Sequence, residues 1–237
     1  MNVEITLLLS TAIFIAFIHT LTGPDHYLPF IVMGKARNWS TQRTLWLTVL
    51  CGIGHVGSSI VLGFIGVLMG LGIQHLNWFE SGRGNIAAWL FLVFGLVYFV
   101  YGMVKAYKNR PHTHIHLHQD GTPHLHEHTH HKEHAHVHAA KGKANITPWI
   151  LFVVFILGPC EPLIPILMYP AAQHSYLGLT LVVIAFSIVT IATMTTIVYL
   201  GLKGIHIISL KFAERYMHAI AGATIALCGF GILFLGL

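Results

Sequence analysis

Six long apolar stretches limit most strongly what this chain can fold into. A helix needs about 20 mostly apolar residues to cross a bilayer, and only 9% of the residues are charged, against about 25% in soluble domains. The sequence therefore predicts an all-α integral membrane protein with six transmembrane helices, embedded in a lipid bilayer. The stretches, with approximate ends, are Ile5–Thr22, Leu45–Ile73, Ile86–Tyr107, Pro148–Tyr169, Leu177–Leu202 and Met217–Leu237.

The positions of the basic residues predict how these helices are oriented. Of the 13 Lys and Arg residues, 12 fall in the loops after the first, third and fifth stretches, and only Arg83 falls in the loop after the second. Loops rich in Lys and Arg stay in the cytoplasm. We therefore expect a multi-pass protein of the plasma (cell inner) membrane, with both termini outside the cytoplasm. The basic residues are spread between apolar stretches, so the sequence pI of about 9.2 does not indicate a nucleic-acid partner.

Two Gly-Pro pairs interrupt the apolar pattern. Gly23-Pro24 follows the first stretch directly, and Gly158-Pro159 lies inside the fourth. Proline ends or kinks a helix, and non-helical backbone at membrane depth is tolerated only inside the protein or beside a water-filled cavity. The sequence therefore predicts that helices one and four are broken and that the breaks lie at an internal pathway.

The two breaks also look like copies of each other. The segment GPDHYLPFIVM at 23–33 aligns with GPCEPLIPILM at 158–168, with an offset of 135 residues. Two halves of three helices each would insert in opposite orientations, and inverted repeats of this kind place a transport site near the bilayer midplane. We expect a first half over 1–107, a cytoplasmic loop over 108–147 and a second half over 148–237. The alternative is chance similarity between two apolar segments that contain Gly and Pro.

Several polar side chains lie in or beside the apolar stretches. A charged group at the bilayer centre costs about 3 kcal/mol on insertion scales, so such residues usually face a cavity and serve a function. Imidazole, carboxylate and thiolate groups are also ligands of divalent first-row metals. The residues predicted to hold a metal ion are His19, Asp25, His26, His55, Cys160 and Glu161.

These residues also have structural interpretations. His19 can be a buried histidine bonded to a carbonyl, Asp25 can cap the next helix, and Cys160 can be a small apolar filler. Four hydroxyl residues are predicted to line the path, although each can instead bond to its own helix backbone. They are Ser58, Ser59, Thr193 and Thr195.

A histidine-rich loop separates the third and fourth stretches. It holds 12 of the 19 histidines, many in H-x-H alternation, and a histidine-rich tract indicates metal binding without selecting the metal. A pH-sensing linker and a simple spacer are the alternatives. A segment without a core of its own is expected to lack fixed structure without metal. The predicted loop ligands are His112, His114, His116, His118, His124, His126, His128, His130, His131, His134, His136 and His138.

The segments IHTLTGPDHYLPFIVM, GIGHVGSS and LGPCEPLIPILMYP resemble the urease-accessory-type membrane proteins of the nickel–cobalt transporter superfamily. The resemblance covers nearly all of the apolar chain. It implies transport of nickel or cobalt, with zinc as a further candidate, in a direction that it does not specify. It also implies that Asp25, His26 and His55 line the metal path. The family typically has four residues between the first His and Asp-His, whereas here five separate His19 from Asp25.

The same motifs are distantly similar to thiol-redox membrane proteins related to cytochrome c biogenesis. In that alternative, Cys160 would relay reducing equivalents. No nucleotide-binding glycine pattern and no catalytic constellation occurs, so we expect neither an enzyme nor a resident cofactor, and an ion gradient or the membrane potential would drive transport. A metallochaperone and a second copy of the chain remain open as partners, and nucleic acid is not expected.

Overall fold

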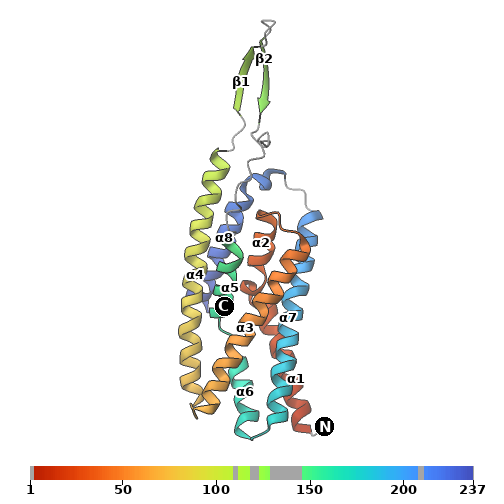
Figure 1. Cartoon of the computed structure of the whole chain (residues 1–237), viewed down its shortest axis with the longest axis vertical. Helices are drawn as coiled ribbons and strands as arrows, with labels where there is room; N and C mark the ends of the chain where they lie inside the picture. Colours follow the sequence, from red (N-terminus) through yellow and green to blue (C-terminus); the bar gives the residue numbers. More distant parts are fainter. Residues whose placement is uncertain (1–2, 109–111, 118–122, 129–145, 208–210, 237) are drawn as a thin grey trace.

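The chain folds into a bundle of helices with one small hairpin at its end (Figure 1). The computed structural model describes residues 3–108, 112–117, 123–128, 146–207 and 211–236. Apart from the hairpin, every regular element in this part of the chain is helical. The helices are α1 (Val3–Thr22), the 3-10 helix η1 (Pro24–His26), α2 (Leu28–Ala36), α3 (Thr41–Leu68), α4 (Ile73–Lys108), α5 (Thr147–Leu157), α6 (Leu163–Ala172), α7 (Tyr176–Ile207) and α8 (Lys211–Leu235).

The predicted all-α membrane protein is confirmed. Five helices, α1, α3, α4, α7 and α8, are long and apolar enough to cross a bilayer. The fourth predicted stretch instead forms two shorter apolar helices, α5 and α6. Large apolar side chains such as Phe14, Trp46 and Leu227 point outward. A soluble monomer rarely exposes so much apolar surface, so this exterior suits a lipid environment.

Both Gly-Pro pairs end a helix. At Gly23 the backbone is extended, with φ −87° and ψ 93°, because a following proline disfavours helical geometry in the residue before it. Gly158 is extended for the same reason, with φ −60° and ψ 135°. The freed backbone groups are partly satisfied nearby, since the Tyr27 hydroxyl donates to the Leu21 carbonyl at 3.2 Å. Such local partners make a break tolerable away from water.

The helix boundaries repeat at the spacing of the two sequence motifs. The ends of α1 and α5, the starts of α2 and α6, and the starts of α3 and α7 are each 135 residues apart. Figure 1 shows α1 and α2 rising from the N-terminal end of the bundle, whereas α5 and α6 descend toward it. The two broken segments therefore run in opposite directions.

Helix α4 begins earlier than the sequence predicts. The third apolar stretch was expected to start at Ile86, which placed Arg83 in a loop, but α4 starts at Ile73 and contains Arg83. The reason is that Arg83 pairs with Glu80, three residues earlier on the same helix. A hydropathy pattern counts the two charges as loop residues, whereas the paired charges are accommodated inside the bundle.

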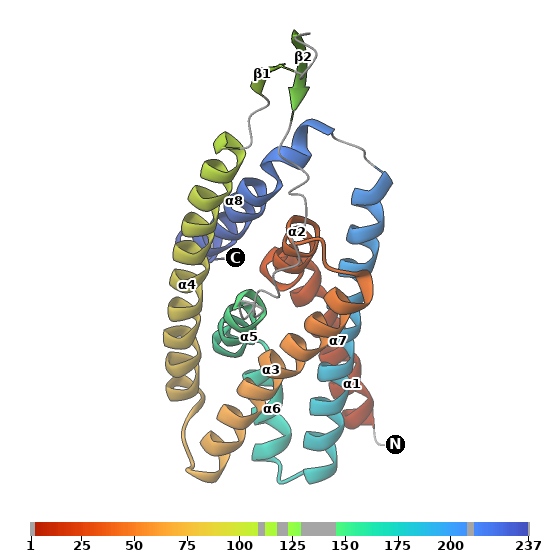
Figure 2. The ribbon, with the colours of Figure 1, turned by 45° about the horizontal axis from the view of Figure 1, so that its top comes forward.

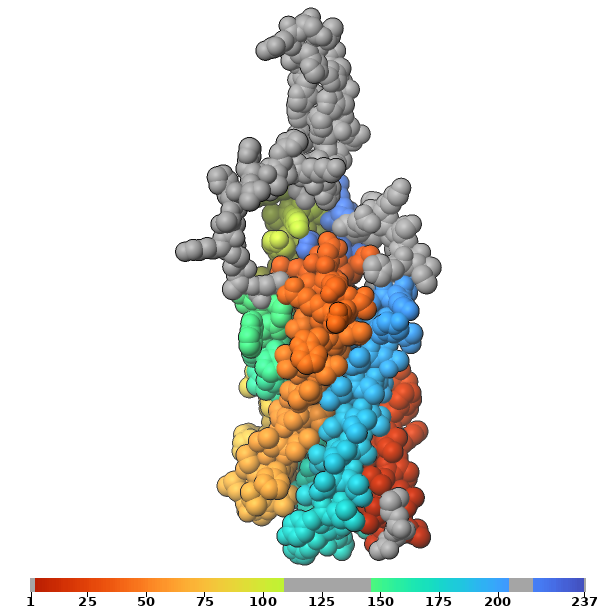
Figure 3. Space-filling view, turned by 45° about the vertical axis from the view of Figure 1, so that its right-hand side comes forward, coloured from red at the N-terminus to blue at the C-terminus, as the bar shows by residue number. Residues whose placement is uncertain are grey.

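The long helices run in both directions along the bundle and pack closely. Figures 1 and 2 show the ends of α4 and α7 at the same end of the bundle as the hairpin, and the α3–α4 and α6–α7 junctions at the other end with the N-terminus. In Figure 3, α3 and α7 lie side by side over most of one face. Helices α4 and α8 approach so closely that a Cβ at Gly95 would lie 2.2 Å from the Ala226 amide nitrogen. Small residues at helix interfaces allow such contact in membranes.

The hairpin lies in the histidine-rich loop. Strands β1 (His112–Leu117) and β2 (Pro123–His128) pair antiparallel, with three histidines of one strand directly opposite three of the other. The expectation that this segment lacks fixed structure is therefore wrong for these two strands. The H-x-H alternation has the period of a β-strand, and Asp120-Gly121 between the strands is a common hairpin signal. Six loop histidines fall outside the described residues, namely His118, His130, His131, His134, His136 and His138.

Candidate metal centre

Three histidines from different elements meet at the first break. His19 lies in the last turn of α1, His26 ends η1 and His55 is in the middle of α3. The His26 ring stands between the other two, with its centroid 4.8 Å from that of His19 and 5.0 Å from that of His55. Both contacts are nearly perpendicular. Three rings that meet edge to face in this way bring ring nitrogens from three different elements close together.

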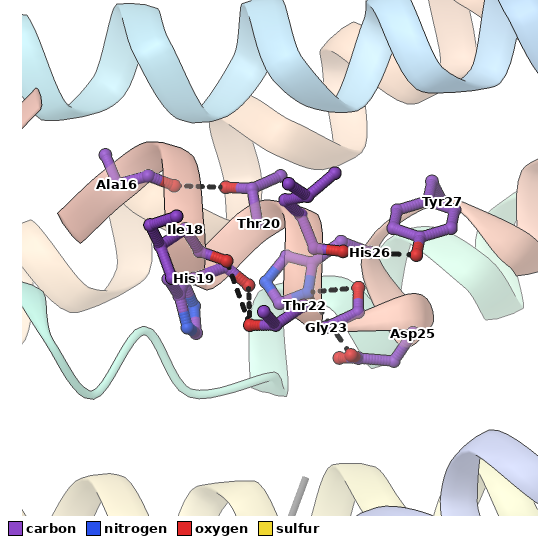
Figure 4. Close-up of polar contacts among 10 residues, drawn as sticks. Ala16, Ile18, His19, Thr20, Thr22, Gly23, Asp25, His26 and Tyr27 are labelled. Atoms are coloured by element: carbon purple, nitrogen blue, oxygen red, sulfur yellow. Dashed lines mark hydrogen bonds and ion pairs between the residues drawn. The ribbon is translucent and has the colours of Figure 1, made fainter. Parts of the chain in front are cut away.

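The hydrogen bonds of His26 determine which of its nitrogens is free. Its Nδ1 lies 3.1 Å from the Gly23 carbonyl oxygen and 3.2 Å from Asp25 Oδ1 (Figure 4). A carbonyl and a carboxylate can only accept, so we infer that Nδ1 carries the proton and donates. The buried Nε2 has no hydrogen-bond partner and presents its lone pair. A carboxylate behind a histidine is a common way to orient a metal ligand.

His55 is oriented by the end of α5. Its ring interacts with the backbone of Phe155 in the last turn of α5. A Cβ built on Gly158 would lie 3.3 Å from His55 Nδ1, so Nδ1 faces the break. The buried Nε2 of His55 is again without a partner, as is Nε2 of His19. The second break, at Gly158-Pro159, therefore helps to orient His55, although the site itself lies at the first break, at Gly23-Pro24.

The spacing of the three rings suits a metal ion. One nitrogen from each ring can be chosen so that all lie within 4.8 Å of one another. Imidazole nitrogens bind zinc at about 2.1 Å, which puts tetrahedral ligands about 3.4 Å apart. A bound ion would therefore draw the rings together by about an ångström. Three unpartnered buried nitrogens are costly to leave without a partner, and a metal cation is a partner to which their lone pairs can donate.

A cavity of about 520 Å³ leads to this group and touches both breaks. Among the residues that line it are Asp25, His26, Pro159 and Glu161. Two carboxyl groups therefore face the same space as the imidazoles, together with Asn85 of α4. Oxygen ligands attract hydrated cations, and imidazoles prefer the borderline transition metals. The cavity can thus admit a hydrated ion and pass it to nitrogen ligands.

The other predicted ligand, Cys160, lies elsewhere. Its side chain is buried in an apolar cluster that includes Ala12, Ala16 and Val56. It does not belong to the group of three histidines. Among the described residues, that group is the only one of three or more His, Cys, Asp or Glu side chains that could hold a metal ion. All three cysteines are free. This placement matches the interpretation of Cys160 as a packing residue more closely than its role as a ligand.

The predicted path-lining hydroxyls divide into two kinds. Ser58 donates to the His55 carbonyl at 2.8 Å and Thr195 to the Ile191 carbonyl at 2.7 Å, so both bond their own helices. Thr193 is half-buried on α7. Ser59 is fully buried and accepts a hydrogen bond of 2.7 Å from Arg83. Only Ser59 is thus joined to a charged group.

Sequence reasoning missed the ion pair of Glu80 and Arg83 and the hydroxyl of Thr190. Glu80 is 1% exposed and Arg83 is 17% exposed. Thr190 is buried with an unpartnered Oγ1, and it is the residue 135 positions after His55. The i, i+3 spacing of Glu80 and Arg83 could have indicated the ion pair. The two residues lie, however, in a polar segment that the sequence predicts to be a loop.

Comparison with known proteins does not assign a family. No protein-family model, no curated protein and no solved structure matches the chain. The function is therefore inferred from the arrangement of its side chains.

Proposed function

We propose that this chain moves a divalent transition-metal ion, nickel or cobalt first and zinc next, across a membrane between its two broken helices. The observation that supports this is the meeting of three histidines at a helix break: His19, His26 and His55 each offer one ring nitrogen within 4.8 Å of the others, and the buried Nε2 of each has no hydrogen-bond partner. Neutral imidazoles bind divalent nickel and zinc well. The resemblance of the surrounding motifs to nickel–cobalt transporters supports the same choice.

The surroundings favour transport over permanent storage. A structural site is closed by four protein ligands, whereas two of the three imidazoles here, those of His19 and His26, line a cavity that is also lined by carboxyl groups. Asp25 supplies negative charge near the ion while its hydrogen bond orients His26. A site with an open position and an open approach can bind an ion and release it.

The architecture that we propose is six membrane crossings in two inverted three-helix repeats. Helices α5 and α6 together would form the crossing that neither makes alone. Support comes from the 135-residue offset of the helix boundaries and from the opposite directions of the broken segments. Helix α3 packs on α7 and α4 packs on α8, so each of these two helices of the first half packs on its counterpart in the second. The site lies where the two halves meet, as in many secondary transporters.

The proposed orientation places the histidine-rich loop in the cytoplasm. Lys35 and Lys105 lie in the last turns of α2 and α4, and Lys203 and Arg215 lie near the end of α7 and the start of α8. Figure 1 shows the ends of α4 and α7 at the hairpin end of the bundle. Arg83 lies inside α4 and no longer counts against this orientation. Basic residues favour the cytoplasmic side of a membrane. The protein would therefore lie in the cell inner membrane with both termini outside the cytoplasm.

A flux assay tests the proposal directly. Purified protein in liposomes is expected to admit Ni²⁺, Co²⁺ or Zn²⁺, detected by an enclosed metal-sensitive dye, and to exclude Mg²⁺ and Ca²⁺, because imidazoles bind these hard cations weakly. Elemental analysis of cells with and without the protein then gives the direction: a rise in cell metal means uptake and a fall means efflux. Liposomes that remain impermeable to all three transition metals would overturn the proposal.

The histidine-rich loop is expected to tune transport without carrying it. Deleting residues 112–138 should change the apparent metal affinity and leave the maximal flux largely intact, because the three histidines of the site, His19, His26 and His55, belong to α1, η1 and α3. The measurement is flux against free metal concentration for the full chain and for the deletion variant at matched amounts in liposomes. Complete loss of flux in a correctly folded deletion variant would contradict this prediction.

A further inference from the structure

A buried ion pair lies beside the second break, outside the three-histidine site. Arg83 Nη2 donates to Glu80 Oε2 at 2.6 Å, and both residues are on α4. Removing two charges from water costs several kcal/mol per ion unless the pair is well bonded. Charged residues within a membrane usually serve a function. The pair is thus a strong candidate for a role connected with transport.

The guanidinium group of Arg83 joins three parts of the structure. Besides Glu80, the same nitrogen donates to Ser59 Oγ on α3 at 2.7 Å and reaches the Gly158 carbonyl oxygen at 3.4 Å. That carbonyl follows the last residue of α5, where the helix dipole favours a positive charge. Arg83 therefore holds the end of α5 against α3 and α4.

The turn that Arg83 contacts also orients His55. His55 Nδ1 and the Phe155 carbonyl oxygen both lie 3.3 Å from the position that a Cβ on Gly158 would take, so the ring rests against the last turn of α5. Arg83 and His55 thus both contact this turn. A movement of the end of α5 would therefore move one of the three imidazoles.

A second contact of α4 with the break supports this arrangement independently. Gly84, next to Arg83, lies so close to Pro159 that a Cβ at position 84 would be 2.7 Å from the proline Cγ. Helix α4 thus presses directly on the break through two consecutive residues. Gly82 on the same helix has no neighbour within 4 Å of its would-be Cβ.

The ion pair is also arranged so that its net charge is zero. An unpaired arginine near a divalent cation would repel it, strongly so in a medium of low dielectric. Glu80 cancels this charge. Glu80 Oε1 and Arg83 Nε remain without hydrogen-bond partners, so the pair is not a fully satisfied structural bridge, and such exceptions call for a functional explanation.

We propose that Glu80 and Arg83 form a charge-neutral positioning pair for the three-histidine site. Arg83 fixes the end of α5, which orients His55, and Glu80 cancels the charge that would otherwise oppose the cation. This inference rests on the proposed function in one respect, namely that the site binds a divalent transition metal.

The test uses the purified full chain in detergent with Co²⁺ as the probe, because its visible absorption reports the number and geometry of its ligands. Arg83→Gln is expected to weaken Co²⁺ binding by about 10- to 100-fold, as is typical for residues that orient a ligand, and to change the spectrum. Arg83→Lys should recover only part of the affinity, since an ammonium group cannot reproduce the planar arrangement of N–H donors in a guanidinium group.

Two further comparisons separate charge from position. Glu80→Gln leaves the charge of Arg83 unbalanced and should weaken binding, whereas the double variant Glu80→Gln/Arg83→Gln should bind more tightly than Glu80→Gln alone. The double variant should still show the altered spectrum of Arg83→Gln. Gly84→Ala should change the spectrum in the same direction by displacing the break, and Gly82→Ala should leave it unchanged.

The outcomes distinguish the two proposals. If the native chain binds no Co²⁺, the proposed function is wrong and the positioning role falls with it. If the native chain binds Co²⁺ and folded Arg83→Gln and Gly84→Ala variants show the native affinity and spectrum, only the positioning pair is overturned. Monodispersity and thermal melting establish that each variant is folded. Should Arg83→Gln fail to fold, the Gly84→Ala and Gly82→Ala comparison decides.

Discussion

Replacing His26 with Ala is expected to abolish metal transport and to weaken Co²⁺ or Ni²⁺ binding by more than about 100-fold. The loss of a residue that only orients a ligand typically costs about 10- to 100-fold in affinity, and His26 is proposed to be a ligand itself. Its ring is the central one of the three, in contact with both His19 and His55. Without it, two imidazoles remain, and the carboxyl group of Asp25 loses its partner.

The measurements are flux into liposomes and Co²⁺ titration of the purified protein. His75→Ala is the matched control, because His75 is an exposed histidine in the first turn of α4, away from the site. Asp25→Asn should give a smaller loss than His26→Ala, since the amide retains one acceptor for Nδ1 but not the charge. A His26→Ala protein with native flux and native affinity would refute the three-histidine site.

The same assays separate metal transport from a thiol relay. Cys160 is packed among apolar side chains, so Cys160→Ser should reduce metal flux little compared with His26→Ala. A thiol relay requires a cysteine that can form and break a disulfide, and in that case Cys160→Ser would be inactive while His26→Ala would keep its redox activity. The reverse order of the two variants would therefore favour the redox alternative.

The sequence predicted the helices and breaks well because those features are local. Apolar length reports a crossing helix, and a Gly-Pro pair reports its interruption. The ends of α1 and α5 fall next to Gly23 and Gly158 for that reason. The start of α4 was predicted wrongly because the feature that decides it is not local. The compensation of Glu80 by Arg83 depends on folding, and a hydropathy pattern does not contain it.

The sequence predicted which kinds of residue form the candidate site, but not which of them come together. Buried polarity indicated His19, His26 and His55 as well as Cys160 and Glu161. The structure unites the first three because the break turns His26 back toward α1 while α3 crosses beside it. Cys160 and Glu161 are adjacent in sequence, yet one packs in an apolar cluster and the other lines the cavity. Which side of a broken segment faces the pathway is decided by tertiary packing.

A single methyl group at Gly23 is expected to inactivate the site as fully as the loss of a ligand. A Cβ at this position would lie 2.5 Å from His26 Nδ1, 2.8 Å from His26 Cε1 and 3.0 Å from Asp25 Oδ1. The backbone angles of Gly23, φ −87° and ψ 93°, are open to any residue. The clash is therefore with the His26 ring, and the ring must move.

Movement of the ring removes what makes His26 a ligand. Its Nδ1 would leave the Gly23 carbonyl and the Asp25 carboxylate, and its Nε2 would leave the point shared with the other imidazoles. Gly23→Ala should therefore lose flux and high-affinity Co²⁺ binding while its thermal stability changes little. Gly57→Ala on α3 is the control, because its Cβ would meet nothing within 4 Å and alanine is favoured over glycine in a helix by about 1 kcal/mol.

Comparison of Gly23→Ala with His26→Ala tests whether the site needs the orientation of the His26 ring as well as the ring itself. If both variants lose Co²⁺ binding and Gly57→Ala keeps it, then the orientation of the His26 ring, and not merely its presence, makes the site. If Gly23→Ala retains native flux and the native Co²⁺ spectrum, the ring binds metal in an orientation other than the one held by Gly23 and Asp25. The assignment of Nε2 as the ligand atom would then be wrong, because it requires Nδ1 to be held by those two hydrogen bonds.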